Sequence, residues 1–255
     1  MRTTRIFVLL ATVAALCLLS GCRCDHAATP PQVGTVTPDT INGVPCYVYL
    51  PHDYAKRTSG KCAEVFPVLY LQHGMYGAEE DWTTQGDLLG IMDELLQAGQ
   101  VKEMVIIMPD NCPHRPTAEE ERANATNGEW ENHFAQFMQD AESRYSIATD
   151  PARRAIAGLS MGGYHTMRVS SLLDGEFAYV GMFSAATFVH EAPTSPVLFW
   201  IAIGREDFLY DDHQKYRCWL DENHIEYAYY ESTGGHTWPN WQDYLGRFLK
   251  RLFLE

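Results

Sequence analysis

The sequence lacks the short patterns that bind metals, phosphates and dinucleotides. It contains no His-x-x-x-His pair, no paired Cys-x-x-Cys, no Gly-x-x-x-x-Gly-Lys loop and no Gly-x-Gly-x-x-Gly fingerprint. His114 and His133 are separated by polar sequence and are expected at the surface rather than around a metal ion. We therefore expect an activity that uses neither a metal nor a cofactor.

Basic residues are also scarce. The 255 residues include 19 lysines and arginines but 33 aspartates and glutamates, which gives a formal net charge of −14 at pH 7. A chain this acidic carries no basic stripe for nucleic acid, and it is a poor match for anionic polymers such as pectin. A solubilising surface is enough to explain the charge, and nucleic acid is excluded as a partner.

The N-terminal residues have the pattern of an export signal. Arg2 and Arg5 precede an apolar run, Ile6 to Leu19, which has the length of a secretory signal and is too short and wrongly flanked for a membrane span. Leu19-Ser20-Gly21-Cys22 then resembles the box of bacterial lipoproteins, which implies cleavage before Cys22 and a lipid on that cysteine. We expect an exported protein that is lipid-anchored at the bacterial cell envelope.

The rest of the chain is expected to form one domain. Residues 1–21 are the predicted lipoprotein signal peptide, residues 22–35 a short tether, and residues 36–255 the folded domain. This length is ample for a sizeable core, and the sequence shows no internal repeat and no second domain.

Strand-like and helix-like segments alternate along this domain. Val33–Ile41 and Val44–Leu50 are predicted to form a hairpin around Asn42-Gly43. Further strands are predicted at 65–71, 104–108, 154–157, 179–183, 197–203 and 227–231, and helices at 88–97, 132–145, 161–173, 213–223 and 241–254. Such alternation is typical of an α/β fold with a mostly parallel sheet and helices on both faces.

One motif lies at a predicted strand-to-helix junction. Gly158-Leu159-Ser160-Met161-Gly162-Gly163 has the Gly-x-Ser-x-Gly pattern of a nucleophile elbow, in which glycines let strand and helix approach closely. The turn strains the serine backbone and holds its hydroxyl beside a helix N-terminus, where developing negative charge is favoured. Ser160 is therefore the predicted nucleophile of an acyl-transfer reaction.

A serine nucleophile needs a base and an acid that orients the base, in the chain order Ser, Asp or Glu, His. His236 is the predicted base because it lies in a glycine-rich loop after the strand-like run 226–231. Asp207 is the predicted acid because it follows the apolar run 196–204 and can reach the same face. The other candidates are expected elsewhere: Glu206 facing away, Asp211 and Asp212 as helix caps, and His213 and His224 as solvated residues of a surface helix.

The oxyanion hole needs backbone N–H donors rather than particular side chains. One donor is expected from Met161, directly after the nucleophile, and the other from Met75, in the loop that follows strand 65–71. His73 in the same loop could serve as a base, but its place before Ser160 favours a structural role in holding the turn.

Two tryptophans and one long loop are candidates for contact with substrate. Trp82 and Trp238 lie in loops near the predicted site and could stack on a sugar or a phenolic ring, with packing as the alternative. The polar segment 111–131 follows the carboxyl end of a strand, so it either overhangs the pocket or is a plain surface loop.

Five cysteines remain besides Cys17 and Cys22, at positions 24, 46, 62, 112 and 218. An odd number leaves at least one unpaired, and export makes disulfides possible. Cys46 and Cys62 flank a predicted hairpin and are the pair to test, with reduced core cysteines as the alternative.

Six short motifs follow one another along residues 33–255: Leu69-Tyr70-Leu71-Gln72-His73-Gly74, Asp81-Trp82, Ile107-Met108-Pro109-Asp110, the elbow, Gly204-x-x-Asp207-Phe208-Leu209 and Gly234-Gly235-His236-Thr237-Trp238. Together they resemble the esterase branch of the α/β-hydrolases, which includes feruloyl esterases, acetyl xylan esterases, S-formylglutathione hydrolase and mycolyltransferases. The resemblance implies Ser160, Asp207 and His236 as the catalytic residues and the Met75 and Met161 amides as the oxyanion hole. Gln72 departs from it, since the family usually has an apolar residue there, and this affects local packing more than chemistry.

The resemblance and the export signal together imply a serine carboxylic-ester hydrolase that forms an acyl-enzyme. Its expected substrates are feruloyl or acetyl esters of plant cell-wall polysaccharide. Two alternatives stay open: acyl transfer to a sugar or lipid, as in mycolyltransferases, and glycan binding without turnover. An intact Ser160, Asp207 and His236 argues against the second alternative.

Overall fold

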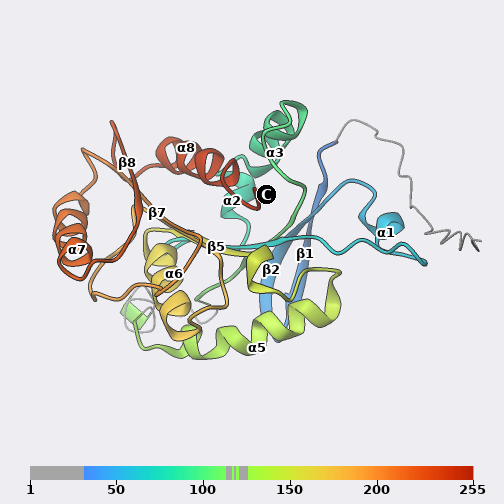
Figure 1. Ribbon diagram of the computed structural model, residues 1–255, viewed down its shortest axis with the longest axis horizontal. Coiled ribbons are helices and arrows are strands. Elements are labelled where there is room, and N and C mark those ends of the chain that lie inside the picture. Colours follow the sequence, from blue (N-terminus) through green and yellow to red (C-terminus); the bar gives the residue numbers. More distant parts are fainter. Residues whose placement is uncertain (1–31, 113–116, 118, 121–125, 255) are drawn as a thin grey trace, which may run out of the picture.

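An eight-stranded sheet runs through the part of the chain that the computed structural model describes, residues 32–112, 117, 119–120 and 126–254 (Figure 1). The strands are β1 Thr35–Ile41, β2 Val44–Leu50, β3 Val68–Gln72, β4 Val105–Pro109, β5 Arg154–Leu159, β6 Tyr179–Phe183, β7 Leu198–Gly204 and β8 Ala228–Ser232. The helices are α1 Tyr54–Arg57, α2 Asp81–Thr84, α3 Leu88–Gln97, α5 Glu129–Arg144, α6 Met161–Leu172, α7 Tyr210–Glu222 and α8 Trp238–Leu249, with one 3₁₀ turn at Pro151–Arg153.

The order of the strands in the sheet is β1-β2-β4-β3-β5-β6-β7-β8. β1 pairs with β2, and β2 with β4, in antiparallel fashion, whereas every pair from β4 to β8 is parallel. The predicted α/β fold with a mostly parallel sheet is therefore confirmed. The predicted hairpin is also present, and its turn residues Asn42 and Gly43 both have positive φ, as a two-residue hairpin turn of this kind requires.

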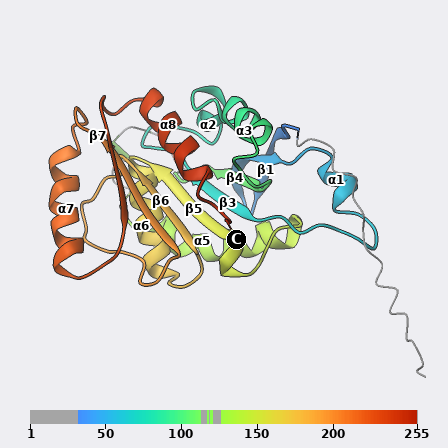
Figure 2. The same ribbon diagram turned by 45° about the horizontal axis from the view of Figure 1, so that its top comes forward.

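Helices cover both faces of the sheet (Figures 1 and 2). On one face α2, α3 and α8 pack over the sheet, and on the other lie α5, α6 and α7. Side chains of β3 alternate between the two cores: Val68 and Tyr70 point to the α5–α6 side, and Leu69 and Leu71 to the α3–α8 side. Because both faces are covered, β3 to β6 are buried along their whole length, which explains their mostly apolar sequences.

Several helix boundaries differ from the prediction. The last helix spans Trp238–Leu249 rather than 241–254. It can begin before Pro239 because N–H groups in the first turn of a helix have no partner within the helix, so a proline there costs no hydrogen bond. The helix predicted at 213–223 begins three residues earlier, at Tyr210, with Asp211 and Asp212 inside its first turn rather than before it. Helices α1 and α2 were not predicted, since each has only four residues.

Cys46 and Cys62, the pair to test for a disulfide, are not bonded to each other, and Cys46 follows the alternative of a reduced core cysteine. Cys46 is a free thiol on β2, and its side chain points into the core on the α5–α6 side. Burial, followed by the charge of Asp39, raises the pKa of this thiol to about 12, so it is un-ionised and inert. Cys62 is disulfide-bonded, but not to Cys46.

The signal peptide 1–21, Cys22 and Cys24 lie outside the described residues, as do most of the predicted tether, His114 and much of the loop 111–131. Among the helices that the structure does describe, none has the length and apolar character needed to cross a membrane.

Candidate active site

The strands that run parallel place their carboxyl ends at one edge of the sheet. The loops that follow β3, β5, β7 and β8 carry, in that order, His73 to Met75, Ser160, Asp207 and His236. Residues as far apart in the sequence as His73 and His236 can therefore meet at this edge, as ligand-facing residues do in open α/β sheets.

Ser160 lies on the turn between β5 and α6 in a strained conformation, with φ 53° and ψ −116°. Hydrogen bonds on both sides of the residue hold this backbone. The Ser160 N–H donates to the Phe183 carbonyl at 2.9 Å, and the Ser160 carbonyl accepts from the Ala186 N–H at 3.0 Å. The loop after β6 thus fixes the serine from behind, and a non-glycine residue persists in this conformation only with such support.

The glycines of the elbow are required by close contacts with backbone and methyl groups. A Cβ on Gly158 would lie 2.4 Å from the Gly162 carbonyl oxygen, and a Cβ on Gly162 would lie 2.3 Å from the His73 carbonyl oxygen. A Cβ on Gly163 would lie 2.5 Å from the Ala185 methyl group. The first turn of α6 therefore rests directly on the end of β3 and on the loop after β6.

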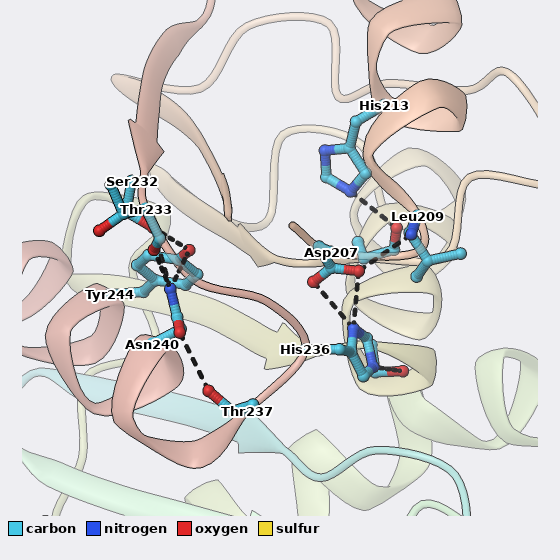
Figure 3. Close-up of polar contacts among 11 residues, drawn as sticks. Asp207, Leu209, His213, Ser232, Thr233, His236, Thr237, Asn240 and Tyr244 are labelled. Atoms are coloured by element: carbon cyan, nitrogen blue, oxygen red, sulfur yellow. Dashed lines mark hydrogen bonds and ion pairs between the residues drawn. The ribbon is translucent and has the colours of Figure 1, made fainter. Parts of the chain in front are cut away.

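Ser160, His236 and Asp207 form one hydrogen-bonded chain, of which Figure 3 shows the contact between His236 and Asp207. His236 Nε2 lies 2.9 Å from Ser160 Oγ, and His236 Nδ1 lies 2.9 Å from Asp207 Oδ2 and 3.1 Å from Oδ1. With its proton on Nδ1, facing the carboxylate, the imidazole leaves Nε2 free to accept the serine proton. The structure thus brings together the three side chains predicted from the sequence, and Ser160 is partly exposed, so a substrate can reach it.

Asp207 is positioned to stay ionised. Burial alone would raise its pKa, but hydrogen bonds from His236 and from the Leu209 N–H, which donates to Oδ1 at 2.9 Å, hold the pKa of Asp207 below its usual range. The carboxylate is inaccessible to solvent, whereas 17% of the His236 side chain is exposed. The charge of Asp207 therefore acts on the imidazole with little screening by water.

The loop that carries His236 is clamped to α8 and to the end of β7. Asn240 Nδ2 donates to Ser232 Oγ at 3.0 Å and to the Thr233 carbonyl at 2.8 Å, and Thr237 Oγ1 donates to Asn240 Oδ1 at 3.0 Å (Figure 3). A Cβ on Gly204 would lie only 2.0 Å from the Gly234 carbonyl oxygen. These contacts fix the distance between the loops of the acid and the base.

His213, predicted to be a solvated surface residue, is completely buried beneath the site. It shares the inner face of α7 with Tyr216 and Leu220, a spacing of three and then four residues that is visible in the sequence and marks a buried helix face. Its Nε2 donates to the Ala185 carbonyl at 2.8 Å, and burial lowers the pKa of His213 to about 4. His224 is exposed, as predicted.

The loop after β3 lies against the nucleophile. A Cβ on Gly74 would lie 3.3 Å from the Ser160 Cβ, so Gly74, the residue before Met75, lies beside the serine. Met161 is the first residue of α6, and its N–H is one of the helix N-terminal amides that have no partner within the helix. Met75 and Met161 stay the predicted oxyanion donors.

His73 has the contacts of a structural residue. It is 1% exposed, its Nδ1 donates to the Gly74 carbonyl at 2.7 Å, and its Nε2 lies 3.2 Å from the Asn111 N–H. Asn111 in turn donates from Nδ2 to the His73 carbonyl at 2.8 Å. These bonds tie the loops after β3 and β4 together, in agreement with the role in holding the turn expected for His73.

Gln72, which departs from the family pattern, is the centre of a buried polar network. Its Nε2 donates to Thr166 Oγ1 at 3.0 Å, and its Oε1 accepts from Trp130 Nε1 at 2.6 Å. Beside it, the buried His165 donates from Nδ1 to Glu131 at 2.9 Å. The polar side chain is therefore satisfied, and it joins β3 to both α5 and α6.

Trp82 is not a substrate contact. Its side chain is completely buried, and its Nε1 donates to the Gln72 carbonyl at 3.1 Å. Trp82 packs edge-on against Trp238, with ring centroids 5.4 Å apart, so it supports that residue from below. Trp238 is partly exposed and stays a candidate for substrate contact.

Three strongly exposed aromatic side chains at this edge of the sheet were not predicted as site residues. They are Tyr76, Phe188 and Phe208, with exposed fractions of 51%, 62% and 75%. Each follows the carboxyl end of a parallel strand (β3, β6 or β7). This position in the sequence could have identified them as candidate site residues. Within the described residues, no group of three or more metal-binding side chains occurs.

The sequence matches the family described as "Putative esterase" over residues 42–219. It is 32% identical over 157 residues to an endo-1,4-beta-xylanase/feruloyl esterase of Xylanibacter ruminicola, covering 58% of this chain and 20% of that protein. It is 37% identical over 132 residues to an esterase of Mycobacterium tuberculosis, covering 51% of this chain and 26% of that protein. The chain thus spans a fifth to about a quarter of the length of these relatives.

Among solved structures, the fold is similar to that of a ferulic acid esterase from the anaerobic fungus Anaeromyces mucronatus. The TM-score is 0.72 at 21% sequence identity, and the match covers 91% of this chain and 94% of the other. At this identity the likeness establishes the shared α/β-hydrolase fold.

Proposed function

Because the chain belongs to the esterase family that matches residues 42–219, we propose that it hydrolyses carboxylic esters through an acyl-enzyme formed on Ser160. The observation that carries the proposal is the continuous hydrogen-bonded chain from Ser160 through His236 to Asp207. Ser160, at the accessible end of this chain, is partly exposed and lies on a strained turn.

In the first half of the reaction, Ser160 Oγ attacks the ester carbonyl while its proton passes to His236 Nε2. The Asp207 carboxylate stabilises the imidazolium that forms, and the Met75 and Met161 amides bind the oxyanion. One such donor is typically worth about 3–4 kcal/mol of transition-state stabilisation. The bond to the alcohol then breaks as His236 returns the proton to the leaving oxygen, which leaves the acyl group on Ser160.

In the second half, water takes the place of the alcohol. His236 Nε2 accepts a proton from this water as its oxygen attacks the acyl carbon, and the same proton returns to Ser160 Oγ when the acid leaves. Each proton that moves is carried by one imidazole nitrogen, so the geometry of His236 against Ser160 governs both halves.

The substrates in the proposal are feruloyl or acetyl esters of plant cell-wall polysaccharide. The relative from Xylanibacter ruminicola is named as a xylanase and feruloyl esterase, and the fungal structure is a ferulic acid esterase. The proposal also includes export and a lipid anchor on Cys22 at the bacterial cell envelope, and this part rests on the N-terminal sequence pattern.

The test compares hydrolysis of methyl ferulate and of an aryl acetate by the purified protein and by Ser160→Ala. We expect turnover that Ser160→Ala abolishes, and a covalent acyl adduct on the native protein after rapid acid quench. The matched control is Ser143→Ala, an exposed serine of α5 that is expected to leave turnover unchanged. Turnover of acetate alone would assign a small acyl pocket, and a folded protein that turns over neither ester would contradict the proposal.

A further inference from the structure

The strongly exposed aromatic side chains of the described residues gather at one edge of the sheet. Tyr76, Phe188 and Phe208 all follow carboxyl ends of parallel strands, at the edge of the sheet that carries Ser160, whereas the large buried aromatics fill the two cores. An exposed aromatic ring forgoes the free energy that burial would supply, and clusters of such rings mark binding surfaces. Of the three, Phe208 contacts the predicted catalytic base, His236, and this contact indicates which part of the substrate it could bind.

Phe208 lies directly against the imidazole of His236. The two ring centroids are 4.5 Å apart and the planes are inclined by 50°. The other aromatic neighbour of His236 is Trp241, edge-on at 4.9 Å, which is only 7% exposed. Phe208 is 75% exposed, so it is the neighbour that presents a free ring face to solvent beside the imidazole.

The backbone of Phe208 is held between two anchored residues. Asp207, before it, accepts the hydrogen bond of His236, and Leu209, after it, donates its N–H to Asp207 Oδ1 at 2.9 Å. These bonds hold the backbone of Phe208 beside His236, and its ring contacts the imidazole at 4.5 Å between centroids. Preorganisation of this kind reduces the entropy lost when a ligand binds.

The chemistry of ester cleavage decides which part of the substrate meets Phe208. The carbonyl oxygen must point to the Met75 and Met161 amides, and the acyl carbon must bond to Ser160 Oγ. The leaving oxygen must come within hydrogen-bond reach of His236 Nε2, because that nitrogen supplies its proton. The alcohol therefore leaves from the His236 side, where the exposed ring is Phe208.

We propose that Phe208 forms a subsite for a neutral sugar ring of the leaving alcohol, with the C–H face of the sugar stacked on the phenyl ring. The inference rests on the proposed esterase function and adds to it the position and the chemistry of the alcohol side of the site. An aromatic face suits an uncharged sugar ring, because the sugar can place apolar C–H groups on the ring and keep its hydroxyls in water.

The test is the ratio of kcat/KM for a feruloyl arabinofuranoside to kcat/KM for methyl ferulate, whose alcohol is too small to reach the ring. In Phe208→Ala we expect this ratio to fall about tenfold. Phe208→Trp keeps an aromatic face and is expected to restore most of the ratio. Circular dichroism of each variant would establish that it is folded.

One exposed residue serves as a matched control. Val197→Ala removes a side chain that is 75% exposed, as Phe208 is, but that precedes β7, at the amino ends of the parallel strands. This variant is not expected to change the ratio by more than about twofold.

Two outcomes would overturn the inference. An equal fall on both substrates in Phe208→Ala would show that the ring only holds His236 in place. An unchanged ratio would show that the sugar does not contact Phe208. Failure of the native protein to hydrolyse either ester is a different result, since it would contradict the esterase proposal itself.

Discussion

At the scale of single residues, the ionisation of Asp207 determines which nitrogen of His236 carries the proton. Its pKa lies below the usual range despite burial, so the carboxylate stays charged throughout the neutral range. An amide in its place would donate to Nδ1 and shift the imidazole proton to Nε2, where it blocks acceptance from Ser160.

Asp207→Asn is therefore expected to lower kcat by roughly 10³ to 10⁴-fold while KM changes little. The comparison is Asp211→Asn, which makes the same chemical change at an exposed position of α7 and should leave kcat within about twofold. Steady-state kinetics on methyl ferulate measure both variants. Near-normal kcat in Asp207→Asn would assign the orienting role to another group.

His213 gives the fold a dependence on pH that is separate from catalysis. Its pKa is about 4 in the folded protein because the ring is buried, and about 6.5 when unfolded. The unfolded chain therefore binds the proton first, so the stability that the neutral ring supplies is complete above about pH 6.5 and is lost as the pH falls toward 4.

His213→Gln removes this titration but keeps an N–H group for the Ala185 carbonyl. Between pH 7 and pH 5 the native protein is expected to lose about 2 kcal/mol more free energy of unfolding than the variant does. Urea unfolding at both pH values measures the difference. Parallel pH profiles would contradict a neutral, buried His213.

The predictability of the site also differs from residue to residue. Ser160 and Asp207 could be found because each follows a buried, apolar strand, and His236 because it lies in a glycine-rich loop after β8; parallel strands bring these carboxyl ends to one edge. The burial of His213 was not predicted because α7 is mostly polar, although its spacing from Tyr216 and Leu220 marks a buried helix face. The burial of Trp82 could not be predicted, because it depends on α2 packing under Trp238, and α2 has only four residues.

At the scale of elements, the contact between α6 and the end of β3 sets the shape of the elbow. Gly162→Ala would press a methyl group against two backbone carbonyls, those of His73 at 2.3 Å and Gln72 at 2.7 Å, which cannot move without shifting β3. We expect a loss of roughly 1–3 kcal/mol in unfolding free energy and loss of most of the esterase activity.

Gly246→Ala in α8 is the matched control. Its new methyl group would have 3.8 Å to the nearest atom, Ile91 Cγ2, so the higher helix propensity of alanine should raise stability by up to about 1 kcal/mol. Thermal and urea unfolding of both variants test the pair. Equal changes in unfolding free energy for Gly162→Ala and Gly246→Ala would contradict the close contacts described for Gly162.

The elements themselves were predictable where their sequence pattern is long and strong. The core strands and α3, α6 and α8 follow from apolar runs and periodicity, but helix ends moved by several residues. The network of Gln72, Trp130 and Thr166 could not be predicted, because its members come from three different elements whose packing fixes the bonds. A glutamine in a buried strand is unfavourable until such partners are known.

At the scale of the whole molecule, the net charge of −14 is expected to select among polysaccharide esters. Feruloyl esters on neutral oligosaccharides should be hydrolysed with a higher kcat/KM than those on oligosaccharides that carry uronic acids, because the protein repels the latter. Raising the ionic strength from about 0.01 M to about 1 M shortens the screening length from about 30 to 3 Å, so the preference should fall severalfold.

Kinetics on paired neutral and acidic substrates at both salt concentrations measure this effect. The rate on methyl ferulate, which is uncharged, should stay constant and serves as the internal reference. A preference that does not change with salt would assign the selectivity to contacts within the site rather than to the field of the whole protein.

The pairing of β3 with β5 also bears on how the protein comes to be active after synthesis. Val68 to Gln72 pair with Arg154 to Gly158, across an intervening chain that contains β4 and α5. Closing contacts of such high contact order is slow, and the elbow is shaped by its contact with the end of β3. A growing or refolding chain therefore has no formed nucleophile elbow until this long-range contact closes.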